Sequence, residues 1–244
     1  MYNKKSVLKP VYPKPLKFFD LNIGSVNIQT GDEKGGGSKL YMVCKEAYQN
    51  NLHIIGLQEV RYRNTGSKII NLNNGEKYMF FWSGPKKRRV GGVGLLIKIC
   101  KDISFEEPDV LNLRMIAINI NINGFHLRLV NAYSPTECEG TVSAKDDFYR
   151  SLRKTCKTQD KKQKLAVIGD FNATTAVSLQ QSYFKGSNLL EDPICNDNGY
   201  RIKSFCREQK LCMTQTYFDH PTEKRYTWES PDKRTNKVLD YILN

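Results

Sequence analysis

Residues 165–173 read LAVIGDFNA, and this stretch decides the class of fold. Its first four residues form a continuous apolar run of strand length, which predicts a strand buried on both faces. Gly169, Asp170 and Asn172 follow. Glycine permits a close approach of the backbone to a ligand, and residues two apart lie on the same side of an extended segment. A tight turn uses the same residue types, so a site and a turn both fit this pattern.

Two shorter segments near the N-terminus extend the prediction. Residues 17–23 and 52–57 are apolar runs of strand length. Between them, apolar residues recur at i, i+3, i+4 and i+7 over residues 40–47, which is typical of a helix with one buried face. The order strand, helix, strand predicts a β-α-β unit.

Alternating segments supply the remaining strands. Residues 116–122 and 125–129 alternate around Asn123-Gly124, which is a strong hairpin signal. The same periodicities predict further strands at 78–82, 93–97, 225–228 and 237–243, and helices at 148–156 and 202–206. Because hairpins and β-α-β units are mixed and no repeat or linker interrupts them, we expect one α/β domain over residues 16–244, after a flexible basic lead-in at residues 1–15.

The composition narrows the class of partner. The chain has 244 residues, 39% hydrophobic and 26% charged, with no apolar run of membrane-spanning length and no secretory signal. Its 38 Lys and Arg against 25 Asp and Glu leave a net charge of +13, which favours nucleic acid over a membrane as partner. The seven cysteines include no Cys-x-x-Cys pair, so we expect reduced thiols in an intracellular protein and no zinc site.

Several polar residues stand where predicted strands end. Glu59 follows residues 52–57, where a carboxylate fits either an Mg²⁺ ligand or a solvated strand end. Asn27 is an amide at another strand end, and Asn131 and Tyr133 offer an amide and a phenol to a phosphate or substrate. Asp240 is an acid within an apolar strand, which requires a buried partner or a function.

The order of these residues along the chain resembles the endonuclease/exonuclease/phosphatase superfamily, which includes DNase I. Within it, the chain is most similar to the endonuclease domains of non-LTR (LINE-type) retrotransposons and to the craniofacial-development-protein-like sequences derived from them. The similarity extends from about residue 18 to the last residue. The segments that carry it are GLQEVR at 56–61, RRVGGVG at 88–94, N-x-Y-x-P at 131–135, GDFNA at 169–173, RYTW at 225–228 and LDY at 239–241.

The resemblance implies a DNase I-like α/β fold, a four-layer sandwich of two mixed sheets flanked by helices. It implies Mg²⁺, or Mn²⁺ in its place, held by Glu59 and Asn27. Tyr133 would contact the scissile phosphate, Asp170 would position or deprotonate the attacking water, and Asn172 would help to orient both. The implied activity is nicking of DNA in the nucleus by a monomeric domain, with a reverse transcriptase domain downstream in the parent protein.

Two departures from the family pattern qualify these expectations. Gln29 stands where AP endonucleases have an acid, which fits the retrotransposon branch better. The family ends with a Ser-Asp-His motif whose His pairs with the acid that Asp240 matches, and residues 1–244 do not contain this motif. We therefore expect the fold to lack its last strand, with an open sheet edge beside Leu243 and weak or no activity. The three histidines are interpreted as structural or exposed: His53, His126 and His220.

The densest basic run, Lys86, Lys87, Arg88 and Arg89, fits either a phosphate-backbone contact or a solvated loop. Three functions follow in order of preference: a DNA endonuclease, a catalytically dead nucleic-acid-binding remnant, and a phosphatase acting on phosphoinositides or other phosphate esters. The third ranks lowest because Ile168 and Leu239 stand where the 5-phosphatases have Trp and Cys.

Overall fold

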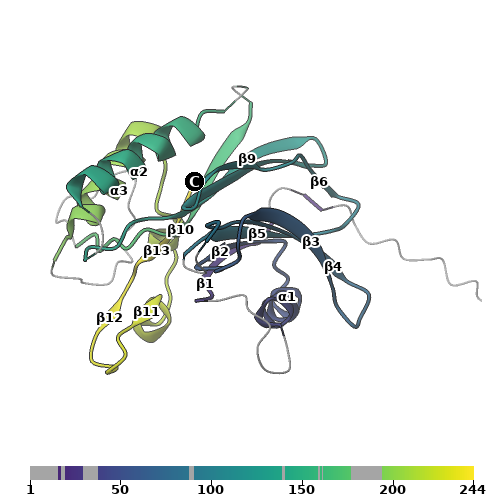
Figure 1. Ribbon diagram of the computed structural model, residues 1–244, viewed down its shortest axis with the longest axis horizontal. Coiled ribbons are helices and arrows are strands. Elements are labelled where there is room, and N and C mark those ends of the chain that lie inside the picture. The colour runs from purple at the N-terminus through teal and green to yellow at the C-terminus, as the bar shows by residue number, and fades with distance from the viewer. Residues whose placement is uncertain are drawn as a thin grey trace, which may run out of the picture.

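The apolar runs of the sequence form the central strands of two sheets in the computed structural model. The structure describes residues 16–17, 20–29, 38–87, 91–138, 141–158, 160, 162–176 and 194–244. The first sheet has the strand order β1-β2-β5-β4-β3, and the second has the order β13-β10-β9-β8-β6, with β7 paired to β8. The two sheets lie face to face, and helices cover their outer sides (Figure 1).

The strands of the first sheet are β1 (Ile23–Asn27), β2 (Ile54–Gln58), β3 (Thr65–Asn71), β4 (Lys77–Ser83) and β5 (Val93–Lys98). Those of the second sheet are β6 (Ile103–Phe105), β7 (Asp109–Asn112), β8 (Met115–Ile122), β9 (Phe125–Tyr133), β10 (Lys164–Asp170) and β13 (Asp240–Leu243). A separate hairpin consists of β11 (Trp228–Glu229) and β12 (Asn236–Lys237). The helices are α1 (Lys39–Gln49), α2 (Val142–Thr155) and α3 (Asp197–Gln209), with two short 3₁₀ helices, η2 (Thr214–Tyr217) and η3 (Thr222–Lys224).

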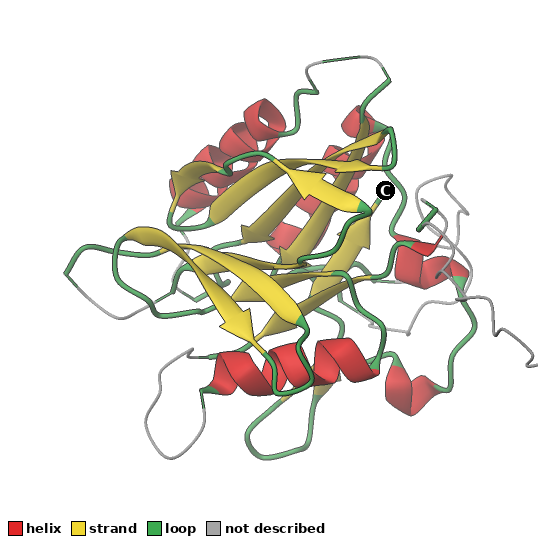
Figure 2. Ribbon diagram, turned by 90° about the vertical axis from the view of Figure 1, so that its right-hand side faces the viewer, coloured by secondary structure: helices red, strands yellow, loops and turns green. Residues whose placement is uncertain are grey.

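Three apolar cores hold the layers together. One lies between the sheets and includes Ile54, Leu95 and Leu129. The second joins the β13-β10-β9 side to α2 and α3, and the third joins the first sheet to α1. Figure 2 shows helices above and below the stacked sheets. The predicted four-layer α/β sandwich with mixed sheets is confirmed. Within the described residues, no helix combines the length and apolar character needed to cross a membrane.

Two parallel strand pairs place polar residues at one edge of the sandwich. β1 and β2 run parallel and are connected through α1, as predicted. β9 and β10 run parallel and are connected through α2, whose N-cap residue Thr141 accepts a hydrogen bond from the Ala144 amide at 3.1 Å. The carboxyl ends of parallel neighbours lie at the same edge of a sheet. Because the two sheets lie face to face with these ends on the same side, the residues at the ends of the four strands lie close together.

The boundaries of several elements differ from the prediction. The first strand does not cover residues 17–23 but begins at Ile23, because the Asn22 carbonyl accepts hydrogen bonds from His53 and Ile54 and its amide donates to the His53 ring. Of residues 225–228, only Trp228 is in a strand. β3, β6 and β7 were not predicted. The expected lead-in, residues 1–15, lies outside the described residues.

The predicted strand at 237–243 is divided in two. The amides of Leu239 and Asp240 donate to the Thr227 hydroxyl, and the Leu239 carbonyl accepts from Phe171. These contacts interrupt the strand between β12, which pairs with β11, and β13, which pairs with β10.

The expectation of an open sheet edge beside Leu243 is wrong. Residues 212–215 cover the outer side of β13: Cys212 and Asn244 exchange two backbone hydrogen bonds, and Met213 forms a bridge with Leu243. The Gln215 side chain completes the cover, accepting from the Ile242 amide and donating to the Asp240 carbonyl. The uncovered edge on this side of the sandwich belongs to the first sheet. It is β1, which pairs only with β2 within the described segments.

Candidate active site

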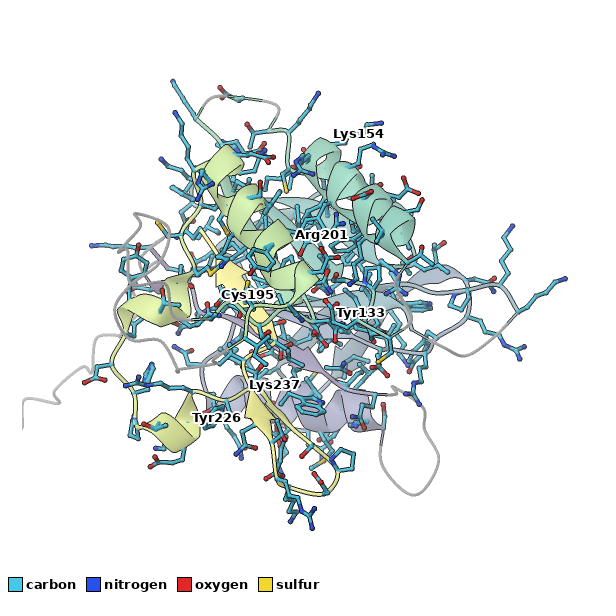
Figure 3. The ribbon with its side chains drawn as sticks, turned by 90° about the vertical axis from the view of Figure 1, so that its left-hand side faces the viewer. Tyr133, Lys154, Cys195, Arg201, Tyr226 and Lys237 are labelled. Atoms are coloured by element: carbon cyan, nitrogen blue, oxygen red, sulfur yellow. The ribbon has the colours of Figure 1, made fainter. Side chains whose placement is uncertain are left out.

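Polar side chains from both sheets meet where the two parallel strand pairs end. Asn27 ends β1, and Glu59 directly follows β2. Tyr133 ends β9, and Asp170 ends β10 directly beside it in the register. Figure 3 views the molecule from another side and labels Tyr133, with Lys237 of the β11–β12 hairpin below it. The structure therefore brings four predicted site residues together from segments up to 143 residues apart.

The Asn27 side chain connects the two sheets at this point. Its Nδ2 donates to Glu59 Oε1 at 3.1 Å and to Asp170 Oδ2 at 3.3 Å. The Tyr133 hydroxyl donates to the same Glu59 oxygen at 3.0 Å. Two carboxylates, one amide and one phenol thus form a continuous hydrogen-bonded cluster.

The backbone turns sharply where Glu59 leaves β2. Glu59 and Arg61 have φ of 52° and 55°, in the left-handed region. The amide of Arg61 donates to the Gly91 carbonyl, and that of Val60 donates to the Gly92 carbonyl, so the glycine loop before β5 holds this turn. The turn directs Arg61 back onto Glu59, with 2.7 Å between Nη2 and Oε2. Arg61 was not among the predicted site residues, although it lies within the quoted GLQEVR segment.

Glu59 is ionised at neutral pH. Burial acts to raise the pKa of its carboxyl group, but the hydrogen bonds from Arg61, Asn27 and Tyr133 outweigh burial and leave the pKa below its ordinary value. Burial and the neighbouring carboxylates raise the pKa of Tyr133, so its phenol keeps its proton and acts as a donor.

Asp170 is the most buried acid of the cluster, with 7% of its surface exposed. Its Oδ1 accepts from the Asn172 amide at 2.9 Å, and Asn172 Nδ2 donates to the Ser134 carbonyl at 3.0 Å. Burial raises the pKa of Asp170, which the hydrogen bonds from Asn172 and Asn27 partly offset and the charge of Glu59 raises further. The bond from the Asn172 amide closes a turn of the kind that the residue types at 169–173 allow, and the same turn places the Asp170 carboxylate beside Asn27, so the two interpretations do not exclude each other.

Asp240 lies on the other side of β10, directly opposite Asp170 in the antiparallel register of β10 and β13. Its Oδ1 is buried and has no hydrogen-bond partner within the described residues. Burial, together with the charge of Asp170, raises the pKa of Asp240 to about 7. Asp240 and His220 both line a cavity of about 690 Å³ beside the site. His53 is buried and accepts from the Asn22 amide, and His126 is exposed.

This environment predicts that Asp240→Asn stabilises the protein at high pH. The folded-state pKa lies above the ordinary value of 3.8, so the native state binds the proton more tightly and loses stability as pH rises from about 4 to about 7. We expect the free energy of unfolding of Asp240→Asn in EDTA to match wild type at pH 4 and to exceed it by on the order of 2–4 kcal/mol at pH 8. Denaturant unfolding at both pH values measures this, with the exposed Asp147→Asn as control. A stability difference that is equal at both pH values contradicts the assignment.

Five other residues singled out in the sequence are not in this cluster or lie outside the described residues. Asn131, interpreted as a phosphate or substrate contact, is fully buried between the sheets, so that interpretation is wrong. Lys86 and Lys87 are exposed in the loop between β4 and β5. Arg88 and Arg89 lie outside the described residues.

The donor set is compatible with a hard divalent cation. Glu59 and Asn27 offer a carboxylate and an amide oxygen, the donor types that Mg²⁺ prefers while it keeps several waters. The described residues contain no group of three His, Cys, Asp or Glu side chains arranged to hold a metal. Asn27 directs its amide nitrogen at Glu59, and its oxygen accepts from the Gln29 amide at 3.1 Å, so presenting that oxygen to a cation would require a rotation of the amide that gives up both contacts.

The fold and this cluster define the class of protein. Residues 24–243 match the endonuclease/exonuclease/phosphatase family, and the chain belongs to that family. It has the fold of nuclease-like phosphodiesterases.

The chain is also similar to individual proteins and to solved structures. The chain is 29% identical over 223 residues to craniofacial development protein 2 of Bos taurus and 28% identical to that of Tragulus javanicus. These matches cover 91% of this chain but only 35% and 36% of those proteins, so the chain spans about a third of their length. Among solved structures, the endonuclease domain of TRAS1, a telomere-specific non-LTR retrotransposon, matches with a TM-score of 0.56 and 15% identity, over 90% of this chain and 82% of that one. An AP endonuclease from Archaeoglobus fulgidus matches with a TM-score of 0.59 and 20% identity, over 91% and 86%.

Proposed function

We propose that this chain is a Mg²⁺-dependent endonuclease domain that nicks DNA, in a protein derived from a non-LTR retrotransposon. The observation that carries the proposal is the cluster in which Asn27 bridges Glu59 and Asp170 and Tyr133 donates to Glu59. Family membership and the likeness to the TRAS1 endonuclease domain support it.

Each residue of the cluster has a separate role in the proposed phosphodiester hydrolysis. In-line attack needs a polarised phosphoryl oxygen, an oriented water and a stabilised leaving oxygen. Glu59 and Asn27 would hold Mg²⁺, which when bound supplies the polarisation. Asp170 accepts a proton from the attacking water, and its raised pKa brings it closer to neutral pH, where a general base is most effective. The second amide proton of Asn172 and the Tyr133 hydroxyl, once turned from Glu59 Oε1, donate to the phosphate. The bond from the water oxygen to phosphorus forms as the bond to one ester oxygen breaks, and that leaving oxygen takes a proton from solvent.

The first test is nicking of supercoiled plasmid at high protein concentration. We expect slow Mg²⁺-dependent conversion to open circles, lost in EDTA and lowered by about 100- to 1000-fold in Glu59→Gln, because that change removes the charge that would hold the cation. Exposed Glu223→Gln is the matched control. Nicking that persists in Glu59→Gln would show a contaminant or a different site.

The loop that carries Lys86 and Lys87 is connected to the segment after Glu59. The Gly84 amide donates to the Asn64 carbonyl, and the Asn64 amide donates to the Pro85 carbonyl. This connection places two exposed cations on the strand-end side of the first sheet. We propose that they contact the DNA backbone, in keeping with the net charge of +13.

Salt dependence tests this contact. We expect Lys86→Ala/Lys87→Ala to reduce the slope of log K against log salt for DNA binding by about 2, one unit for each lost phosphate contact. Lys154→Ala/Lys157→Ala, exposed at the C-terminal end of α2, should leave the slope unchanged. Equal slopes for both pairs would exclude a specific role for the β4–β5 loop.

A DNA-binding domain without cleavage is the second candidate, and the environment of Asp240 favours it. The Asp240 carboxyl group has a side-chain hydrogen bond with Thr227, but its buried Oδ1 has no donor, so the described residues do not supply a group that neutralises Asp240. Salt-sensitive binding without nicking would support this candidate. The retrotransposon origin further implies a reverse transcriptase domain in the parent protein and a nuclear site of action, which the transcript around this reading frame tests.

A further inference from the structure

The Asn131 side chain forms a polar connection between the two sheets. It belongs to β9 of the second sheet and is fully buried. Its Nδ2 donates to the Leu57 carbonyl of β2 at 2.9 Å and to the Gly94 carbonyl of β5 at 2.8 Å. Its Oδ1 accepts from Gln58 Nε2 at 2.7 Å. One amide therefore contacts two strands of the opposite sheet.

Gln58 extends this connection to the third strand that carries a site residue. The side chain is fully buried, and its Nε2 also donates to the Ser25 hydroxyl of β1 at 3.0 Å. Asn131 lies two residues before Tyr133, Gln58 lies directly before Glu59, and Ser25 lies two residues before Asn27. Each member of the connection thus sits on the strand of one site residue.

The sequence leaves room for this connection at Gly56. A side-chain carbon there would lie 2.8 Å from Asn131 Oδ1 and 2.7 Å from Ile168 Cδ1. Gly56 therefore lets the sheets approach closely enough for the amide to reach across. Gln58 Oε1 is buried and has no partner within the described residues, so the donors of Gln58, and not its acceptor, determine how this side chain lies.

Directional bonds matter here because most of the contact between the sheets is apolar; another polar link is the Ser83 hydroxyl, which donates to the Asn112 carbonyl at 2.8 Å, and Phe81 packs edge-to-face on Phe105. Residues such as Ile54, Leu95 and Leu129 pack across it without a preferred angle. Hydrogen bonds between amides restrict distance and direction together. The 3.0 Å contact between Tyr133 and Glu59 joins the same two sheets a few residues further along.

We propose that Asn131, acting with Gln58, is a positioning residue that sets how the Tyr133 and Asp170 half of the site lies against the Glu59 and Asn27 half. This inference rests on the proposed function for its kinetic consequence, but its structural consequence does not depend on cleavage. Asn131 touches no substrate, since it is fully buried.

The test compares Asn131→Leu with Leu129→Ala. Leu replaces the amide with an apolar side chain of similar size, and Leu129 lies two residues earlier on the same face of β9 in the core between the sheets. We expect Asn131→Leu to lower kcat for plasmid nicking by about 30- to 100-fold with KM within about threefold, because small displacements of reacting groups cost rate steeply. Leu129→Ala should lower the melting temperature at least as much and leave kcat within about threefold of wild type.

A double variant shows whether the two amides act as one unit. Gln58→Leu/Asn131→Leu should lose no more than about threefold beyond the larger single effect, because each single change already breaks the connection. Multiplied single effects, or equal kcat losses in Asn131→Leu and Leu129→Ala, would overturn the proposal.

A readout without cleavage separates this proposal from the proposed function. The 13 tyrosines are replaced with 3-fluorotyrosine, and Tyr133→Phe identifies the fluorine resonance of Tyr133. We expect that resonance to shift or split in Asn131→Leu and to stay in place in Leu129→Ala. If wild type does not nick DNA but this pattern holds, the proposed function fails and the positioning role stands. A Tyr133 resonance unmoved in Asn131→Leu would refute the positioning role whatever the activity.

Discussion

We expect Asp170→Asn to lower kcat for plasmid nicking by about 10³- to 10⁴-fold, with KM changed by less than about threefold. Asn keeps the size of the side chain and an acceptor for the Asn172 amide, but it cannot take a proton from water. Asp170 is also the acid that Asn27 links to Glu59, so its charge would add to that of the proposed cation site. Single-turnover nicking at saturating DNA measures the change.

A measurement of stability distinguishes a loss of catalysis in Asp170→Asn from unfolding of the variant. Because burial raises the pKa of Asp170, removing its charge should leave the melting temperature at pH 8 equal to or above that of wild type. Asp147→Asn, exposed on α2, should match wild type in both rate and stability. An Asp170→Asn protein that is folded and nicks within tenfold of wild type would remove Asp170 from the mechanism.

Gly169→Ala should destabilise the fold by about 3–5 kcal/mol, or prevent soluble expression. Gly169 has φ of 143°, and a Cβ there would lie 1.9 Å from the Ala132 carbonyl oxygen. That oxygen belongs to the neighbouring strand β9, and β10 is held between β9 and β13, so the backbone has little freedom to move away. Denaturant unfolding followed by circular dichroism measures the loss.

Gly75→Ala distinguishes the effect of the steric clash with Ala132 from the effect of placing a side chain at positive φ. Gly75 also has positive φ, at 87°, but no atom lies within 4 Å of a Cβ built there. We expect this variant to lose about 1 kcal/mol, the cost of placing a side chain in that conformation. Equal losses at the two positions would mean that the contact with Ala132 is relieved by a small shift.

Local patterns predicted the strands that have a strong periodicity or a turn signal. The alternation on either side of Asn123-Gly124 became the β8–β9 hairpin, and the apolar run at 165–168 became β10. β3, with the sequence TGSKIIN, was missed because its residues alternate only between exposed and partly exposed positions, so no apolar face marks it. β7 has four exposed residues and gives no signal at all.

The site could be predicted in its members but not in its connections. Asn27, Tyr133 and Asp170 each end a strand and Glu59 directly follows one, and the family motifs identify all four. The roles of these residues stay predictions. The connection through Asn131 could not be found in this way. Its partners lie 37 to 74 residues away in the sequence, and the sequence does not distinguish a buried asparagine from an exposed one. Only the fold shows that this amide turns inward while Tyr133 faces the site.

The left-handed backbone at Glu59 bears on the history of such sequences. A glutamate at φ of 52° is strained, and glycine or asparagine would adopt that angle more easily. In a copy released from selection for cleavage, these replacements would be favoured by stability and would accumulate by drift. A lineage under selection retains the acid despite the strain. Under the proposed function, related sequences that cleave DNA should therefore keep the glutamate at position 59, and those that do not should carry glycine or asparagine there more often.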